Sequence, residues 1–192
     1  NESMTHEYKN IVDIFIDFTN KWHNNDNAVS IDDNGKITAN DRIVVLLNQK
    51  LLKTCNFIED GKLLLKFDKI EYSLKLENLA KLKSLDNLPT IINGELSLEN
   101  CKNIKTFDLD IKSYGSLAIQ KCNFDNLNNV RNVKESILLM DLKKIKSFDK
   151  LPSTTISDAT SVLKLYDMFI DSTLKTTNNN IYNLELHKIS GF

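Results

Sequence analysis

Residues 74–142 repeat one short pattern four times, as Leu74-Lys-Leu76-Glu-Asn-Leu79, Leu96-Ser-Leu98-Glu-Asn-Cys101, Leu117-Ala-Ile119-Gln-Lys-Cys122 and Ile137-Leu-Leu139-Met-Asp-Leu142. The copies begin 22, 21 and 20 residues apart. Each copy opens with an apolar residue, a residue expected to point outward, and a second apolar residue. This is the alternation of a β-strand. One coil of this kind buries its apolar side only when neighbouring coils stack on it. The pattern therefore predicts a repeat solenoid of parallel strands.

The segments between the copies also carry a repeating apolar pattern. Apolar residues follow at roughly every third position, at Leu82, Leu85, Leu88, Ile104, Phe107, Phe124, Leu127, Val130, Val133, Ile145, Phe148 and Leu151. A period of about 20–29 residues is typical of leucine-rich-repeat solenoids. Because these return segments are short, we expect 3₁₀ turns or extended loops in them. The sequence thus predicts a mainly β, leucine-rich-repeat-like solenoid over residues 28–160.

Composition limits the function classes. The chain of 192 residues has 25 basic and 26 acidic residues and a formal charge of −1. It therefore gives no global electrostatic case for binding nucleic acid or an anionic membrane. No apolar run approaches the length of about 18 residues that a membrane span needs, and the N-terminus lacks the apolar region of a signal peptide. We expect a soluble, intracellular protein with no membrane partner.

An amphipathic helix is predicted at the start of the chain, within an N-terminal region of residues 4–27. Its apolar residues are spaced by three and four, at Tyr8, Ile11, Val12, Phe15, Phe18 and Trp22. Thr5 fits the N-cap position. Such a helix ordinarily covers the open end of a solenoid, which would otherwise expose core side chains and strand edges. The alternative is that its aromatic face, with Phe15 and Trp22, binds a partner.

The segment between this helix and the repeats is less regular. Asp32-Asp33-Asn34-Gly35 lies between two alternating stretches and predicts a tight turn, since the further ligands of a calcium-binding EF-hand are absent. The apolar runs Arg42–Leu47 and Lys62–Phe67 predict strands that begin the stack. The first run is alternatively a short helix that continues to Leu52.

Three stretches in order carry a resemblance to a known group of proteins. They are Val29-Ser-Ile31-Asp-Asp-Asn-Gly35-Lys-Ile37, Leu65-Lys-Phe67-Asp-Lys-Ile70 and Leu82-Lys-Ser-Leu85-Asp-Asn-Leu-Pro89-Thr-Ile-Ile-Asn-Gly94-Glu-Leu96-Ser-Leu98. Over roughly residues 28–152 the chain resembles leucine-rich-repeat-like proteins encoded by large tailed bacteriophages, most clearly at Ser84, Leu85, Pro89 and Gly94. Later copies lack the proline, and their turn glycine is displaced to Gly115 or lost. The resemblance implies a bacteriophage origin, the cytoplasm of the infected bacterial host as location, and a non-catalytic role.

The repeat period breaks after Pro152. Residues 154–159 fit a further strand, and residues 161–173 predict a helix from the spacing of Val162, Leu165, Tyr166, Phe169 and Ile170. Residues 184–189 return to the strand pattern. Residues 161–192 are therefore expected to form a C-terminal cap, made of a helix near the C-terminus and a final strand.

No motif in the sequence indicates catalysis. Cys101 and Cys122 are one repeat period apart at the same core position, so stacked buried thiols are favoured over a metal or redox pair. His6, His23 and His187 lie in distant segments without metal-ligand spacing, and a glycine-rich phosphate loop is absent. We expect no enzyme, no catalytic residue, no metal and no cofactor.

The outward residues of the strands form the most informative surface. They predict two columns: Lys75, Ser97, Ala118, Leu138, Thr155; and Glu77, Glu99, Gln120, Met140, Ser157. Glu77 and Glu99 are interpreted as solvated surface rather than as an acid–base pair. Leu138 and Met140 predict a protein-docking spot, unless the strand slips by one residue or the helix at 161–173 covers them. The candidate partner-binding residues are Lys75, Glu77, Ala118, Gln120, Leu138 and Met140, with Phe15 and Trp22 from the N-terminal helix.

Three function classes follow. The leading one is a non-catalytic interaction module that binds and modulates a host protein. The second is a structural or assembly component of the virion. The third is a nucleic-acid-binding protein or nuclease, for which Lys143, Lys144 and Lys146 form a small basic cluster, although a solvated turn is the simpler interpretation. The pattern favours no particular oligomeric state.

Overall fold

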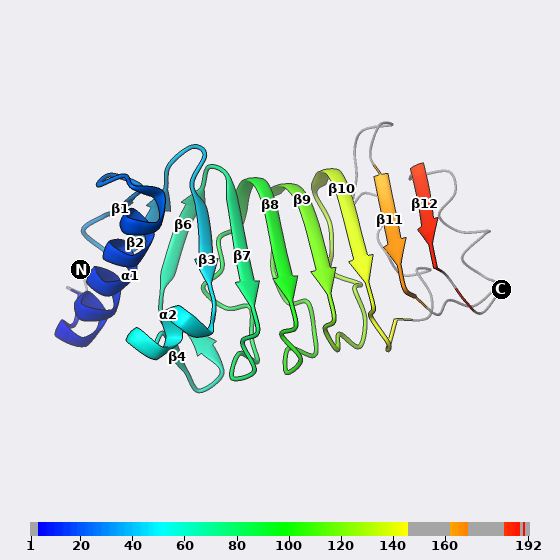
Figure 1. Ribbon diagram of the computed structural model, residues 1–192, viewed down its shortest axis with the longest axis horizontal. Helices are drawn as coiled ribbons and strands as arrows, with labels where there is room; N and C mark the ends of the chain where they lie inside the picture. The colour runs from blue at the N-terminus through cyan, green and yellow to red at the C-terminus, as the bar shows by residue number, and fades with distance from the viewer. Residues whose placement is uncertain (1–3, 146–161, 169–182, 189, 191–192) are drawn as a thin grey trace.

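Parallel strands stacked along one axis form the main sheet of the described part of the chain (Figure 1). The computed structural model describes residues 4–145, 162–168, 183–188 and 190. The stack consists of β3 (Val44–Leu47), β7 (Ser73–Glu77), β8 (Ile91–Glu99), β9 (Ser113–Gln120), β10 (Val133–Met140), β11 (Val162–Tyr166) and β12 (Asn183–His187). Each strand pairs in parallel with the next. The predicted mainly β solenoid of parallel strands is therefore confirmed.

The strands pair in the register that the repeats predict. Leu74 lies opposite Leu96, Leu96 opposite Leu117, and Leu117 opposite Ile137. All four side chains are at most 1% exposed. Complete burial of such a side chain contributes about 1.5–3 kcal/mol. The stacked inner residues therefore form one continuous core along the axis.

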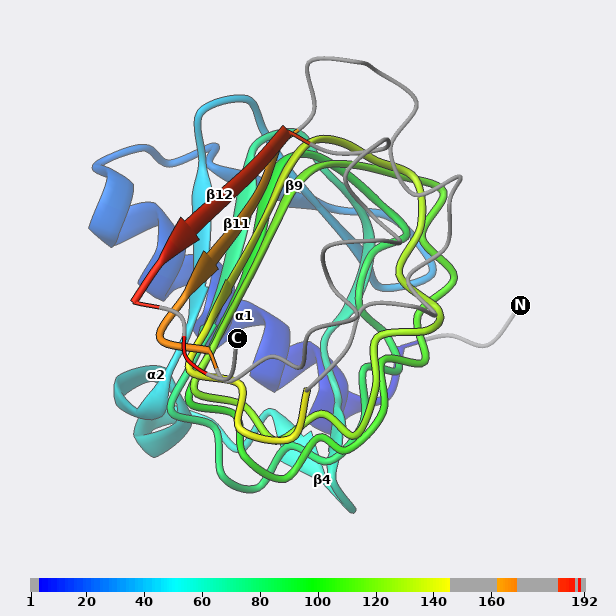
Figure 2. The same ribbon diagram turned by 90° about the vertical axis from the view of Figure 1, so that its right-hand side faces the viewer.

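The return segments between the strands contain turns and extended chain, without helix, over residues 78–90, 100–112 and 121–132. Their apolar residues, spaced about three apart, are buried as the sequence predicts; Phe148 and Leu151 lie outside the described residues. Figure 2, which looks along the stack, shows the strands superposed on one side and the return segments enclosing the core. Each coil thus buries its strand and its return segment against the neighbouring coils.

A residue in the left-handed backbone conformation directly follows each of the strands β7 to β12. These residues have φ between 49° and 58° and are Asn78, Asn100, Lys121, Asp141, Asp167 and Lys188. The N–H of Asn78 donates to the carbonyl of Glu99, and the N–H of Asn100 donates to that of Gln120. Asparagine and aspartate tolerate this backbone conformation better than most residues. The residue after the strand, which is Asn or Asp in four of these six positions and Lys in two, therefore marks the end of the strand.

Two glycines allow neighbouring strands to approach closely at a bulge. A Cβ on Gly94 would lie 2.3 Å from the carbonyl oxygen of Tyr72, and one on Gly115 would lie 2.4 Å from that of Asn93. The pairing of β8 with β9 changes register between Ile92 and Glu95, opposite Gly115. Gly115 is therefore beside Gly94 in the stack, and not displaced as the sequence alone indicated.

The first coils are built from shorter elements. β1 (Val29–Ile31) and β2 (Lys36–Ala39) form an antiparallel hairpin, whose predicted tight turn is closed by Asp32 Oδ1 accepting from the N–H groups of Asn34 and Lys36. β2 pairs with β6 (Lys66–Ile70) and β6 with the start of β8, while β4 (Ile58–Glu59) and β5 (Lys62–Leu63) form a separate small hairpin. A strand and a short helix are the two alternatives for the run that begins at Arg42. Both are present, because β3 is followed directly by helix α2 (Gln49–Thr54).

Helix α1 (His6–His23) packs on these first coils. Thr5 caps it by accepting the N–H of Tyr8. Phe15 is 0% exposed and packs edge-on against Phe67, with ring centroids 6.0 Å apart. The Tyr8 hydroxyl accepts the N–H of Lys66 and donates to the carbonyl of Gly35. The helix therefore covers the N-terminal end of the core, as expected of a capping helix.

The prediction of a helix over residues 161–173 is wrong at residues 162–166, which form β11 beside β10. Leu163 pairs with Ile137 and Leu165 with Leu139, so this stretch is a further copy of the strand pattern, completed by buried Met168. Pairing with β10 prevails over a spacing that also fits a helix. The predicted final strand is confirmed as β12, whereas residues 154–159 and 169–173 lie outside the described residues.

Candidate functional site

The outward side chains of the strands form two columns on one face, which we call the strand face. The first column is Leu46, Lys75, Ser97, Ala118, Leu138 and Lys164, and the second is Glu77, Glu99, Gln120, Met140, Tyr166 and His187. Lys164 and Tyr166 occupy the places predicted for Thr155 and Ser157, which lie outside the described residues. Sequence reasoning missed Lys164 and Tyr166 because it assigned them to a helix.

Leu138 and Met140 remain outward and partly exposed. Their neighbours Ile137 and Leu139 are 1% and 0% exposed, so a slip of one residue in β10 is excluded. Residues 162–166 lie beside β10 as a strand, so this part of the chain does not cover the pair as a helix. The two side chains therefore form an apolar spot on the strand face.

The face is charged at β7 and β8. Glu77 lies opposite Glu99, and Lys75 lies opposite Ser97. Glu95 precedes Ser97 by two residues on β8 and therefore lies on the same side of the sheet. Burial raises the pKa of the Glu95 carboxyl above its ordinary value, an effect that the Lys75 ammonium opposes. The Glu95 N–H donates to Ser73 Oγ at 3.1 Å. This end of the face therefore presents acidic groups around one lysine.

The face becomes aromatic at its C-terminal end. The rings of Tyr166 and His187 stack with centroids 4.4 Å apart and planes 5° apart. Between the two ends, Gln120 is partly exposed, whereas Ala118 is only 3% exposed and offers little contact area. The second column thus changes from acidic at Glu77 to apolar and aromatic at its far end.

The two candidate residues of α1 have different environments. Phe15 is part of the core, so it is removed from the candidate partner-binding residues because a side chain with no exposed surface cannot contact a partner. Trp22 is 51% exposed, and its ring lies against that of His23. The His23 ring nitrogen Nε2 is 2.9 Å from the carbonyl oxygen of Val44, which holds this end of α1 beside β3.

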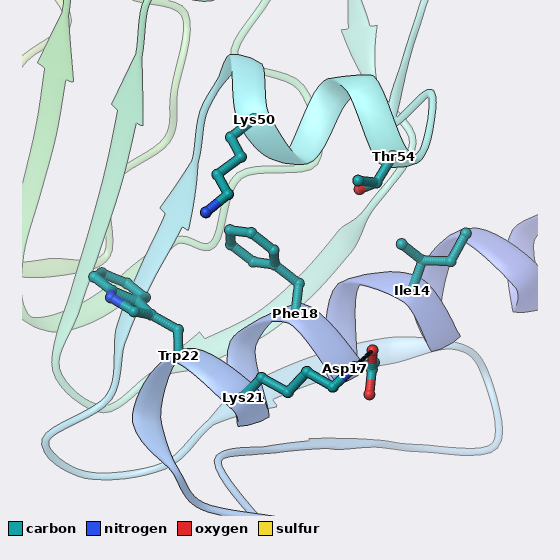
Figure 3. Close-up of a pocket in the computed structure, with 7 residues that line it drawn as sticks. All are labelled: Ile14, Asp17, Phe18, Lys21, Trp22, Lys50 and Thr54. Carbon is teal, nitrogen blue, oxygen red and sulfur yellow. Dashed lines mark ion pairs between the residues drawn. The ribbon is translucent and has the colours of Figure 1, made fainter.

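A groove of about 450 Å³ separates α1 from α2 (Figure 3). It is lined by Ile14, Asp17, Phe18, Lys21, Trp22, Lys50 and Thr54. Sequence reasoning found Trp22 but not the groove, because α2 was only an alternative to a strand. The available signal was the spacing of Ile14, Phe18 and Trp22, four residues apart on one side of α1. In Figure 2, α2 and one end of α1 stand outside the sheet on the side of the strand face.

The cysteines are free and buried, as the prediction of stacked thiols requires. Burial raises the pKa of Cys101 to about 12 and also raises that of Cys122. The Cys101 thiol donates to the carbonyl of Leu76, and the Cys122 thiol donates to that of Leu98. Within the part of the chain that the structure describes, no three His, Cys, Asp or Glu side chains form a metal-binding group.

Nothing in the described residues forms a helix long and apolar enough to cross a membrane. No protein-family model, curated protein or solved structure matches the chain. The relationship to bacteriophage proteins therefore stays a prediction, and the function of the strand face has to follow from its own geometry.

Proposed function

We propose that the chain is a non-catalytic, bacteriophage-encoded interaction module that binds and modulates a host protein through the strand face. The observation that carries this proposal is the apolar spot of Leu138 and Met140, held outward in a regular parallel register. Burying such an apolar surface against a partner contributes about 25 cal/mol per Å².

The rest of the face supports a protein as the partner. Acidic groups at β7 and β8, an apolar centre and the ring of Tyr166 provide the mixture of polar and aromatic contacts that protein interfaces use. The columns are fixed by strand pairing, so little conformational freedom is lost on binding. A nucleic acid is less well matched, since Glu77, Glu95 and Glu99 would repel phosphates.

The basic cluster after β10 gives the nucleic-acid hypothesis little support. Lys144 Nζ is 3.0 Å from Asp125 Oδ1, so part of its charge is already balanced. Lys143 is exposed, and Lys146 lies outside the described residues. Retention on a DNA or RNA column at low salt, lost on changing Lys143 and Lys144 to Glu, would favour nucleic-acid binding over the proposal.

The proposal is tested with the double variant Leu138→Glu, Met140→Glu, which places two charges on the apolar spot. The protein captured from bacterial lysate by the unmodified chain is purified, and its Kd is measured for both chains. We expect the double variant to weaken binding at least about tenfold, because apolar contacts at the centre of an interface dominate its energy. The circular dichroism and unfolding midpoint of the variant verify that it folds.

A matched control carries Lys81→Gln and Asn128→Glu, which remove one positive charge and add one negative charge at exposed positions of the return segments and so lower the net charge by the same two units. This control should bind like the unmodified chain. Equal binding by the double variant would contradict the proposal. Self-association or copurification with virions, without a host partner, would instead favour the structural or assembly component.

A further inference from the structure

Helix α1 carries two apolar stripes rather than one. Val12 and Phe15 are buried in the core. The second stripe consists of Ile14, Phe18 and Trp22, which line the groove between α1 and α2. Four residues of helix rise about 6 Å, so the second stripe extends over about two turns. Capping the stack accounts for the first stripe but leaves the second partly uncovered.

The groove has the form of a site for a helix. Two helices, α1 and α2, make its walls, and Phe18 and Trp22 project from α1 toward the side of α2 that carries Lys50 (Figure 3). The Thr54 hydroxyl donates to the carbonyl of Leu51 at 2.7 Å, so this hydroxyl is already hydrogen-bonded within α2. A partner helix with apolar residues at i, i+3, i+4 and i+7 matches the spacing of the second stripe.

The charges at the groove favour an acidic partner. Lys21 Nζ is 2.9 Å from Asp17 Oδ2, so these two residues largely balance each other. Lys50 takes part in none of the ion pairs found among the described residues. A carboxylate entering beside Lys50 gains a partner, whereas an ammonium is repelled.

We infer that the groove between α1 and α2 binds an acidic amphipathic helix of a partner protein, with its apolar side chains against Ile14, Phe18 and Trp22 and a carboxylate at Lys50. This surface is separate from the apolar spot on β10, so the inference goes beyond the proposed function. A groove open enough to leave Trp22 51% exposed suits a helix better than a small molecule, which a pocket usually buries by 70–90%.

Trp22 makes the test direct, because the chain contains one tryptophan. The probe is a synthetic helical peptide with leucines at i, i+3, i+4 and i+7 and glutamates on both flanks. Two further peptides are its twin with lysines in place of the glutamates and an acidic peptide of the same composition in scrambled order. We expect the first peptide to shift Trp22 emission to shorter wavelength in a saturable titration, with the other two weaker by at least about fivefold.

Lys50→Glu should weaken binding of the acidic peptide about fivefold and improve binding of the lysine twin. The matched control is Lys53→Glu, which makes the same change on α2 at an exposed residue outside the groove lining and should leave both affinities unchanged. Trp22→Phe should abolish the emission signal while fluorescence anisotropy of a labelled peptide still reports binding.

The double variant Leu138→Glu, Met140→Glu should bind the acidic peptide like the unmodified chain, which separates this test from that of the strand face. Equal binding of the acidic peptide and its scrambled form would overturn the inference, as would equal losses in Lys50→Glu and Lys53→Glu. An emission shift that depends on protein concentration without peptide, with a dimer in sedimentation, would show that a second copy occupies the groove instead.

Discussion

At the scale of single residues, Cys101 and Cys122 show that the repeat buries reactive thiol groups in the core, where they are unreactive. Each thiol follows its strand by the same offset, is at most 1% exposed and donates to a backbone carbonyl of the preceding coil. A thiolate is strongly disfavoured there because burial removes its solvation. The sulfur atoms therefore act as small apolar groups of the core.

This burial predicts a pH dependence of stability. The pKa of Cys101 is raised from 9.0 to about 12 in the folded chain. The unfolded chain therefore loses this proton first, and the stability that the protonated thiol contributes, fully present below pH 9, is lost as the pH rises toward 12. We expect the stability advantage of the unmodified chain over Cys101→Ala to shrink by about 1.4 kcal/mol per pH unit above about pH 9. Urea titrations of both chains at several pH values measure this, and a constant difference would contradict it.

At the scale of elements, the strands of residues 74–142 could be predicted because their apolar residues repeat at nearly constant spacing. The strand at 162–166 could not, because 26 residues separate Ile137 from Leu163, against 20 to 22 between the earlier copies. Its spacing of Val162, Leu165 and Tyr166 also fits a helix. Only the pairing with β10, which is a contact distant in sequence, decides between the two.

The candidate functional residues could also be predicted only in part. The outward positions of Lys75, Glu77, Leu138 and Met140 follow from the alternation of the strands, and the structure places all four on the strand face. The division of α1 into two stripes did not follow, since Phe15 and the groove residues belong to one broad apolar face in sequence. Which part of that face is buried depends on the position of β6 and α2.

The two stripes of α1 predict unequal effects of the same substitution. Phe15→Ala removes a fully buried ring that packs on Phe67 and should lower the free energy of unfolding by about 3–5 kcal/mol. Phe18→Ala removes a partly exposed ring in the groove and should cost about 1–2 kcal/mol. Denaturant unfolding of the two variants provides the comparison, and equal losses would show that the groove residue is also a core residue.

At the scale of the whole molecule, the stack is nearly one-dimensional. The contacts of the strands are chiefly with adjacent strands, as between β8 and β9 or β9 and β10. Stability in such a structure is approximately a sum of the intrinsic stabilities of the coils and the interactions between neighbours. A destabilising substitution in one coil should therefore affect chiefly that coil and its neighbours.

Leu139→Ala tests this directly, because Leu139 is 0% exposed and lies opposite Ile119 in β9 and Leu165 in β11. We expect it to cost about 2–5 kcal/mol locally and to accelerate amide hydrogen exchange in β9, β10 and β11. Exchange in β3 and β7 should remain as slow as in the unmodified chain, because neither strand pairs with β10, which carries Leu139. Leu74→Ala, a matched substitution at the other end of the stack, should reverse the pattern and accelerate exchange in β3, β7 and β8. Uniform acceleration in both variants would show instead that the coils unfold as one cooperative unit.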